Sequence, residues 1–73
     1  MNLPEMHYVS SSNVESVGYD EETSTLYVSF LTGFLYTYLN VPIVVFNQLL
    51  HAPSVGGYLN ANIKGVYLDN RIK

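Results

Sequence analysis

The sequence contains no cysteine, which excludes a disulfide framework and any metal site built on thiolates. Small domains often need such cross-links, because a chain of 73 residues buries only about 60% of its unfolded surface. Packing between elements, or a partner subunit, therefore has to supply the stability. The same length predicts a single domain over residues 1–73, since two separate cores need a longer chain.

Charge is scarce, and positive charge is the scarcer kind. Charged residues make up 12% of the chain, and Lys64, Arg71 and Lys73 stand against six acidic residues, for a net charge of -3. Lys and Arg side chains supply most non-specific affinity for phosphates, so this balance disfavours RNA as a partner. Apolar residues reach 48%, too many for a disordered chain. So few surface charges favour a protein partner or self-association.

Long apolar runs are also missing. The longest, residues 43–46, falls far short of the about 18 residues that a membrane-spanning helix requires. The opening MNLPEMHYVSSS has neither the basic nor the apolar region of a secretory signal. We therefore expect a soluble, cytoplasmic protein that makes no contact with a membrane.

Three stretches, residues 14–19, 25–30 and 34–39, have the pattern of strands. In the second, TLYVSF, the residues Leu26, Val28 and Phe30 alternate with polar or aromatic neighbours and share one face. Residues 20–24 are polar and predict a turn between the first two strands.

The stretch FLYTYLNVP raises the question of which way its two tyrosines point. Residues 31–33 suit a three-residue hairpin loop, whose last position must be left-handed and is a glycine. That loop places Phe34, Tyr36 and Tyr38 on the same face as Leu26, Val28 and Phe30, beneath the expected helices. A two-residue loop over residues 32–33 would turn them to the opposite face, because a one-residue slip reverses every side chain. We prefer the longer loop, since it builds one continuous apolar face.

Two helices are expected after the strands. Asn40 predicts an N-cap and Pro42 falls in the first turn of a helix that ends at Pro53. Its buried stripe consists of Val41, Val45, Phe46, Leu49 and Leu50. Ser54 predicts the cap of a second, weaker helix over residues 55–63.

This order predicts an α+β fold, with a three-stranded antiparallel sheet covered on one face by two helices in the order β-β-β-α-α. Residues 66–68 could add a short C-terminal strand, residues 1–8 form a loose arm and residues 69–73 a frayed tail. The other sheet face would be covered by the arm or would contact another chain. It would carry Thr25, Tyr27, Ser29, Leu35, Thr37 and Leu39.

From Ser11 to Tyr67 the chain resembles a KTSC domain, a small module found at the C-terminus of some lysyl-tRNA synthetases and as a stand-alone protein. The shared residues are the Ser-rich start before Val14, Val17-Gly18-Tyr19-Asp20, Leu26-x-Val28-x-Phe30, Gly33, Tyr36-x-Tyr38, Val41-Pro42, Ala52-x-Ser54-x-Gly56-x-Tyr58-x-Asn60, Ile63-Lys64 and Tyr67. From the synthetase context, the resemblance implies an association with RNA. This chain departs from the family in its acidity, and in Val55 and Gly57 where members often carry a basic residue.

The stretch PSVGGYLNANIK, residues 53–64, is a candidate binding segment. Its members are Ser54, Gly56, Gly57, Tyr58, Asn60 and Lys64. A helix start with two glycines offers free backbone N–H groups to an anion such as phosphate. The plainer interpretation is capping by Ser54 with close packing of the helix on the sheet through the glycines, and Asn60 could equally be a buried amide.

Tyr36 and Tyr38 are the second candidate. Aromatic side chains on a sheet can stack on the bases of single-stranded RNA, but such surfaces usually have a basic groove. We therefore favour core tyrosines whose hydroxyls reach the sheet edge.

No set of residues predicts catalysis, a metal or a cofactor. His7 and His51 lack further ligands at suitable spacing, and His51 is better explained as a partner of a helix C-terminus. Residues 20–22 are consecutive acids in an exposed turn. We expect a non-enzymatic interaction module of the KTSC type that binds protein or, weakly, RNA. The alternative is a structural homodimer or assembly subunit that makes contact through an exposed apolar sheet face.

Overall fold

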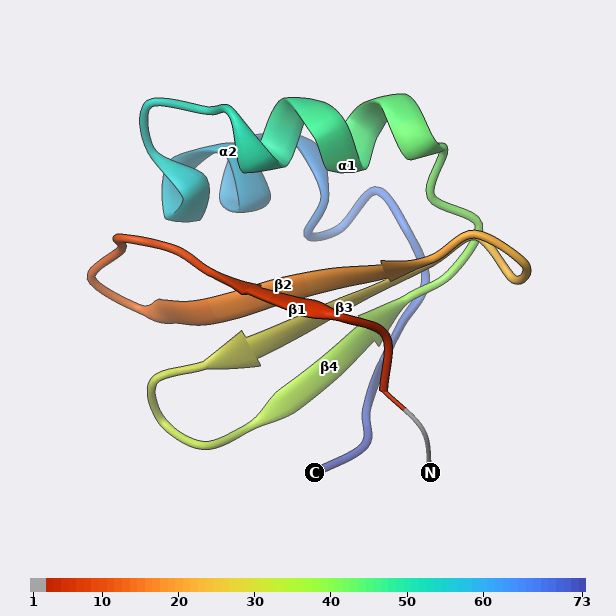
Figure 1. The fold of residues 1–73 in the computed structure, drawn as a ribbon, viewed down its shortest axis with the longest axis horizontal. Helices are drawn as coiled ribbons and strands as arrows, with labels where there is room; N and C mark the ends of the chain where they lie inside the picture. The colour runs from red at the N-terminus through yellow and green to blue at the C-terminus, as the bar shows by residue number, and fades with distance from the viewer. Residues whose placement is uncertain (1–2) are drawn as a thin grey trace.

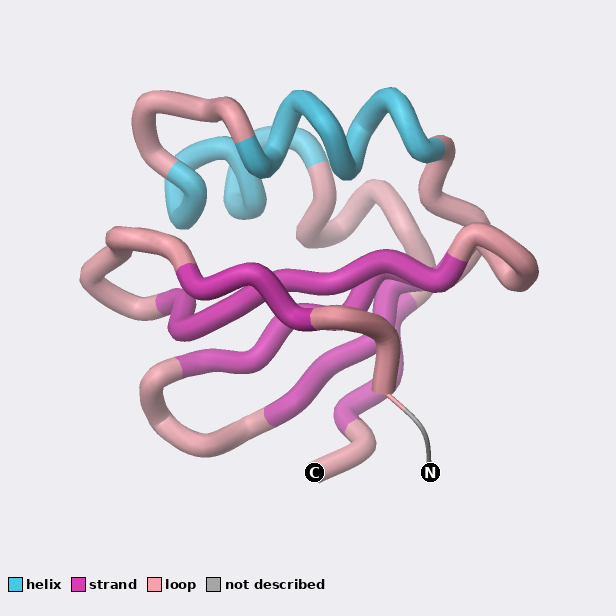
Figure 2. Tube along the Cα trace, viewed as in Figure 1, coloured by secondary structure: helices cyan, strands magenta, loops and turns pink. Residues whose placement is uncertain are grey.

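The computed structural model describes residues 3–73, which form an antiparallel sheet with two helices on one face (Figures 1 and 2). The expected α+β layers are therefore confirmed. The elements are β1 (Met6–Tyr8), β2 (Val14–Asp20), β3 (Thr25–Phe30), β4 (Leu35–Tyr38), α1 (Ile43–Leu50), α2 (Val55–Asn62) and β5 (Asp69–Arg71).

The sheet has five strands rather than the three that we expected. The strands lie in the order β1-β2-β3-β4-β5, and every neighbouring pair is antiparallel. β1 comes from the segment expected as a loose arm, and β5 from the segment expected as a frayed tail. The short C-terminal strand lies at residues 69–71 and not at 66–68. Both added strands have only three residues, and each depends on a longer neighbour for its hydrogen bonds.

The hairpin between β3 and β4 has the three-residue loop that the sequence predicts. The Phe30 N–H donates to the Phe34 carbonyl at 2.9 Å, and Ser29 pairs with Leu35. Gly33 closes the loop with a φ of 96°, in the left-handed region that a residue with a Cβ atom resists. The register places both β4 tyrosines on the face that the helices cover.

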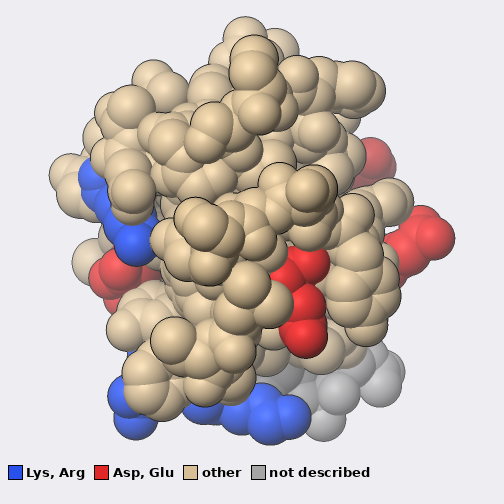
Figure 3. Space-filling model, turned by 90° about the vertical axis from the view of Figure 1, so that its left-hand side faces the viewer, with Lys and Arg blue, Asp and Glu red and all other residues tan. Residues whose placement is uncertain are grey.

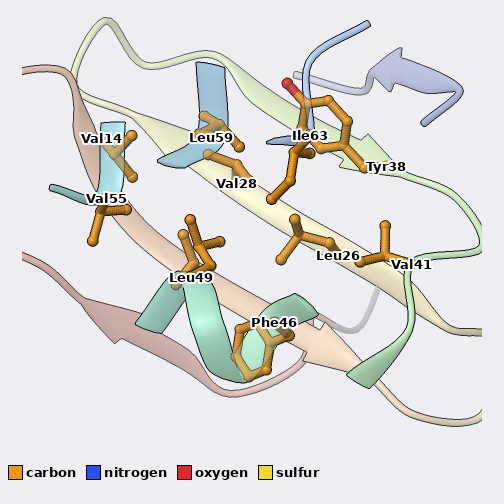
Figure 4. Packing of buried hydrophobic residues seen from close by; sticks show 11 residues of the cluster. Val14, Leu26, Val28, Tyr38, Val41, Phe46, Leu49, Val55, Leu59 and Ile63 are labelled. Atoms are coloured by element: carbon orange, nitrogen blue, oxygen red, sulfur yellow. The ribbon is translucent and has the colours of Figure 1, made fainter. Parts of the chain in front are cut away.

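The core lies between this sheet face and the two helices (Figure 4). Leu26 and Val28 of β3 meet Leu49 of α1 and Leu59 of α2, and all four side chains are completely buried. Gly56 permits a close approach, though of the β1–β2 loop rather than the sheet. A Cβ atom there would lie 2.6 Å from Oδ1 of Asn13.

The helix ends agree with the sequence prediction at one helix and not at the other. Ser54 caps α2, accepting a hydrogen bond from the Gly57 N–H at 3.0 Å. Asn40 does not cap α1, because it takes a left-handed conformation (φ 57°) in the turn and Pro42 is the N-cap. The entry to α1 is fixed instead by Tyr19, whose hydroxyl donates to the Val41 carbonyl.

The second sheet face is largely closed by the two ends of the chain. Leu35 is only 6% exposed, and Leu3, Ile72 and Lys73 line a hollow beside it. The Ile72 N–H donates to the Leu35 carbonyl at 2.8 Å, and the Lys73 carbonyl accepts from the Leu35 N–H. Figure 1 shows the C-terminus and the start of the described chain on the side of the sheet away from the helices. Of the two expected roles for this face, the structure supports coverage by the chain's own ends.

Candidate functional site

A groove lined by four aromatic rings opens at the edge of the helix-covered face. Its volume is about 390 Å³, within the about 300–1,000 Å³ typical of ligand pockets. We call it the aromatic groove; it is lined by Phe30, Thr32, Phe34, Tyr36, Tyr38, Lys64 and Asp69.

Strand pairing brings these side chains to one place. Tyr38 pairs with Leu26 of β3 on one side and with Asp69 of β5 on the other. Tyr36 lies between Val28 and Arg71 in the same way. Directly paired residues of antiparallel strands point to the same face, so the groove combines tyrosines from β4 with charged side chains from β5.

The rings form a connected series, with one cation above each of two phenylalanines. Phe30 and Tyr36 pack edge to face with ring centroids 5.6 Å apart, and Tyr36 stacks on Tyr38 at 6.5 Å. Nζ of Lys64 lies 5.1 Å from the Phe30 ring centroid, within cation–π range. Cζ of Arg71 lies 4.6 Å from that of Phe34, whose side chain is 44% exposed.

The two tyrosines differ in exposure although they share a face. Tyr38 is 1% exposed and belongs to the core, and Figure 4 shows its hydroxyl at the margin of the cluster beside Ile63. Tyr36 is half-buried and lines the groove. Burial raises the pKa of Tyr38 to about 12, with smaller contributions from the charges of Asp69 and Tyr36. The Tyr38 phenol is therefore neutral, and a hydrogen-bond donor, throughout the physiological pH range.

A second hollow lies where the β1–β2 loop meets the start of α2. Its volume is about 430 Å³, and its lining is mostly polar. We call it the polar hollow; it is lined by residues 10–13, 53–57 and Asn60. The Ser11 hydroxyl already accepts hydrogen bonds from the N–H groups of Asn13 and Val14 and donates to the Asn13 side chain. These hydrogen bonds all lie within residues 11–14, so the Ser11 hydroxyl is already satisfied inside the loop.

The structure divides the predicted site residues between the two places. Tyr36, Tyr38 and Lys64 line the aromatic groove. Those in the polar hollow are Ser54, Gly56, Gly57 and Asn60. Tyr58 lies in neither, and its hydroxyl donates to Oε1 of Gln48 at 2.6 Å, which joins the two helices. Asn60 is exposed, so the alternative of a buried amide was wrong.

The sequence analysis did not propose as site residues four residues that line the groove, nor Arg71, whose guanidinium lies over the Phe34 ring. Phe30 and Phe34 were assigned to the covered face without regard to how far the helices extend. Thr32 was assigned only to the hairpin loop. Asp69 and Arg71 fall in the segment expected to fray, yet they have the same alternate spacing as the two tyrosines opposite them.

Among residues 3–73 the structure offers little support for a metal site or a role for His51 beyond the helix end. No group of three or more His, Cys, Asp or Glu side chains there could hold a metal ion. Nδ1 of His51 forms a hydrogen bond with the Asn47 carbonyl oxygen at 2.8 Å. This confirms the prediction that His51 is a partner of the C-terminus of α1. None of the helices described is long and apolar enough to cross a membrane.

Comparison with protein families gives a match to the KTSC domain over residues 10–67. A protein of Tsukamurella paurometabola is 41% identical over 59 residues, which cover 81% of this chain and 88% of that protein. A lysine–tRNA ligase of a Nostoc species is 38% identical over 56 residues, 77% of this chain but 10% of the ligase.

Comparison with solved structures gives the same result for the fold. The crystal structure of a KTSC domain protein from Yersinia pestis superposes with a TM-score of 0.91 at 33% sequence identity. The match covers 94% of this chain and 97% of that protein. The five-stranded sheet with two helices on one face is thus shared by two chains that differ at most positions.

Proposed function

This chain belongs to the KTSC domain family, and from that premise we propose that it is a non-catalytic module that binds a short single-stranded segment of RNA in the aromatic groove. The observation that carries the proposal is that partly exposed aromatic rings and two of the chain's three cations meet in one place. Proteins that bind single-stranded nucleic acid combine these features. A lysine–tRNA ligase with a matching region adds support for RNA.

The net charge of -3 argues against RNA to the extent that acidic groups lie near the groove, and one of the six, Asp69, lines it. Half of them, Asp20, Glu21 and Glu22, are at the β2–β3 turn, whereas one end of the groove opens at the β3–β4 loop. The other end reaches Tyr38, which pairs with Leu26 at the end of β3 near that turn. β3 has six residues, so its two ends lie roughly 20 Å apart. That separation is more than twice the screening length of about 8 Å at physiological salt. The acidic turn is therefore screened from the end of the groove where Lys64 and Arg71 lie over the phenylalanines, and Asp69 is the acidic group in the lining itself.

Figure 3 shows acidic and basic groups together on one face of the molecule. Most of the face shown is uncharged, and the Lys and Arg groups lie along one side and the lower edge. One acidic group adjoins the basic group on that side, and another lies near the middle of the face. A bound strand would meet positive charge at the margin of the groove and aromatic surface within it.

Stacking should contribute more to this binding than charge. Each base stacked on an aromatic ring contributes about 1–3 kcal/mol in related systems. Lys64 and Arg71 together would neutralise two phosphates, which corresponds to a slope of only about −1.4 in log K against log salt concentration. The expected complex is weak and mildly sensitive to salt.

The proposal is tested by fluorescence anisotropy with a short labelled single-stranded RNA, at about 20 mM and about 150 mM salt. The wild-type protein should bind at the lower salt concentration. Lys64→Gln should weaken binding about five- to tenfold, because it removes a cation beside the groove. Lys73→Gln is the matched control, since it removes the same charge outside the groove lining and should change affinity less than twofold.

Absence of binding at the lower salt concentration would reject the proposal. Equal losses in the Lys64 and Lys73 variants would show that binding follows total charge and not the groove. A homodimer through the second sheet face has less support than the groove, because Leu35 and Thr37 there are buried within one chain.

A further inference from the structure

The presence of Asp69 in the aromatic groove needs an explanation, because a carboxylate repels the phosphates of RNA. It pairs directly with Tyr38 across β4 and β5, and both residues line the groove. A groove that only followed the RNA backbone would gain affinity from a neutral residue at this position. A carboxylate is useful there if it accepts hydrogen bonds from a base edge.

We propose that Asp69 makes the groove selective for guanine, an inference that rests on the proposed function. The carboxylate has two acceptor oxygens and no donor. Guanine alone presents two adjacent donors, N1–H and the N2 amino group, on its Watson–Crick edge. Adenine and cytosine place an acceptor beside their amino group, and uracil flanks its single N–H with two carbonyls. In the same two-point contact, any of these three bases would set a lone pair against the carboxylate, so each can donate only one hydrogen bond to it.

The rest of the groove fits one nucleotide held in this orientation. Phe30, Phe34 and Tyr36 supply aromatic surface for the base, and Lys64 lies in the same lining as a partner for phosphate. The Tyr38 phenol, which pairs with Asp69 across β4 and β5, adds a neutral donor to the groove without a second negative charge. The volume of about 390 Å³ is at the low end of the range for ligand pockets.

The test uses short uridine-rich RNAs that differ only in one central base, which is guanine, adenine, cytosine, uracil or hypoxanthine. The guanine RNA should bind about tenfold more tightly than the adenine, cytosine and uracil forms. The hypoxanthine form, which lacks the N2 amino group, should lie in between. Because this series uses only the wild-type protein, it does not depend on how any variant folds.

Asp69→Asn tests the residue itself. The amide places a donor in the groove, so the preference for guanine should fall below twofold while the all-uridine RNA binds more tightly. Glu21→Gln is the matched control, an acid-to-amide change in the exposed β2–β3 turn that should leave the preference intact.

The outcomes separate the two proposals. Binding of every RNA with equal affinity would overturn guanine selection and leave the RNA groove standing, whereas binding of none would overturn both. Retained preference in Asp69→Asn would also reject the role of Asp69. Guanosine monophosphate that binds as tightly as the guanine RNA would identify a free nucleotide as the ligand, retaining guanine selection and rejecting RNA.

Discussion

The helix-covered face of the sheet has two halves. In both, alternate side chains point toward the helices, but the two halves differ in how far those side chains are exposed to solvent. Over β2 and β3, side chains such as Val17, Leu26 and Val28 are sealed beneath the helices. Over β4 and β5, the same face carries Tyr36 and Arg71, which remain accessible. Alternation therefore determines which face a side chain occupies, and the path of the helices determines whether that face is core or binding surface.

The largest difference between the halves should appear on truncation of a side chain. Leu26→Ala removes a completely buried side chain and should lower the free energy of unfolding by about 2–5 kcal/mol, measured by urea denaturation. A loss below about 1 kcal/mol would mean that this half is less tightly packed than its burial indicates.

Alkaline pH should destabilise the domain through Tyr38, at the boundary between the halves. Its pKa is about 12 in the folded protein and 10.0 when unperturbed, so the folded state holds this proton more tightly than the unfolded state. The stabilisation is fully present below pH 10 and is lost as pH rises toward 12. The loss should be about 2 kcal/mol, seen by urea unfolding across that range. Tyr38→Phe is the control, and an unchanged pH dependence in it would assign the effect to other groups.

A change in the β3–β4 loop tests how firmly the aromatic half is kept in register. Gly33→Val places a β-branched residue at a φ of 96°, where no other atom lies within 4 Å of the new Cβ atom, so the penalty comes from the backbone alone. The free energy of unfolding should fall by about 1–2 kcal/mol in urea denaturation. A neutral result would show that the loop readily adopts another conformation.

The smallest effect on stability is expected in the groove. Phe34→Ala truncates a ring that is 44% exposed and should cost less than about 1 kcal/mol in the same assay. It should nevertheless weaken binding of single-stranded RNA about fivefold, because one stacking surface is lost. A large loss of stability would show that the Phe34 ring is packed as tightly as the buried core side chains.

The sequence correctly predicts those elements whose own residues show a local signal, such as alternation, a turn glycine or a capping residue. The β3 alternation, the glycine in the hairpin loop and the Ser54 cap are local signals, and all three are confirmed by the structure. They also place Tyr36 and Tyr38 on the correct face.

The rest depends on contacts between distant segments. β1 and β5 contain Met-His-Tyr and Asp-Asn-Arg, which lack an alternating apolar pattern and are strands only because β2 and β4 pair with them. The groove could not be found without β5, since it places Asp69 and Arg71 beside the tyrosines. Local signals also did not reveal that Phe34 is 44% exposed although it shares a face with the core.

The position of β5 in the chain has a consequence for the order of assembly. β1 to β4 are joined by short turns, whereas β5 joins β4 only after both helices have been made, some thirty residues later. A nascent chain that ends before residue 69 can already bury the aliphatic side chains of β2 and β3, but it has neither the carboxylate nor the guanidinium that flank the tyrosines. Recognition would thus begin only after β5 has been made and has paired with β4.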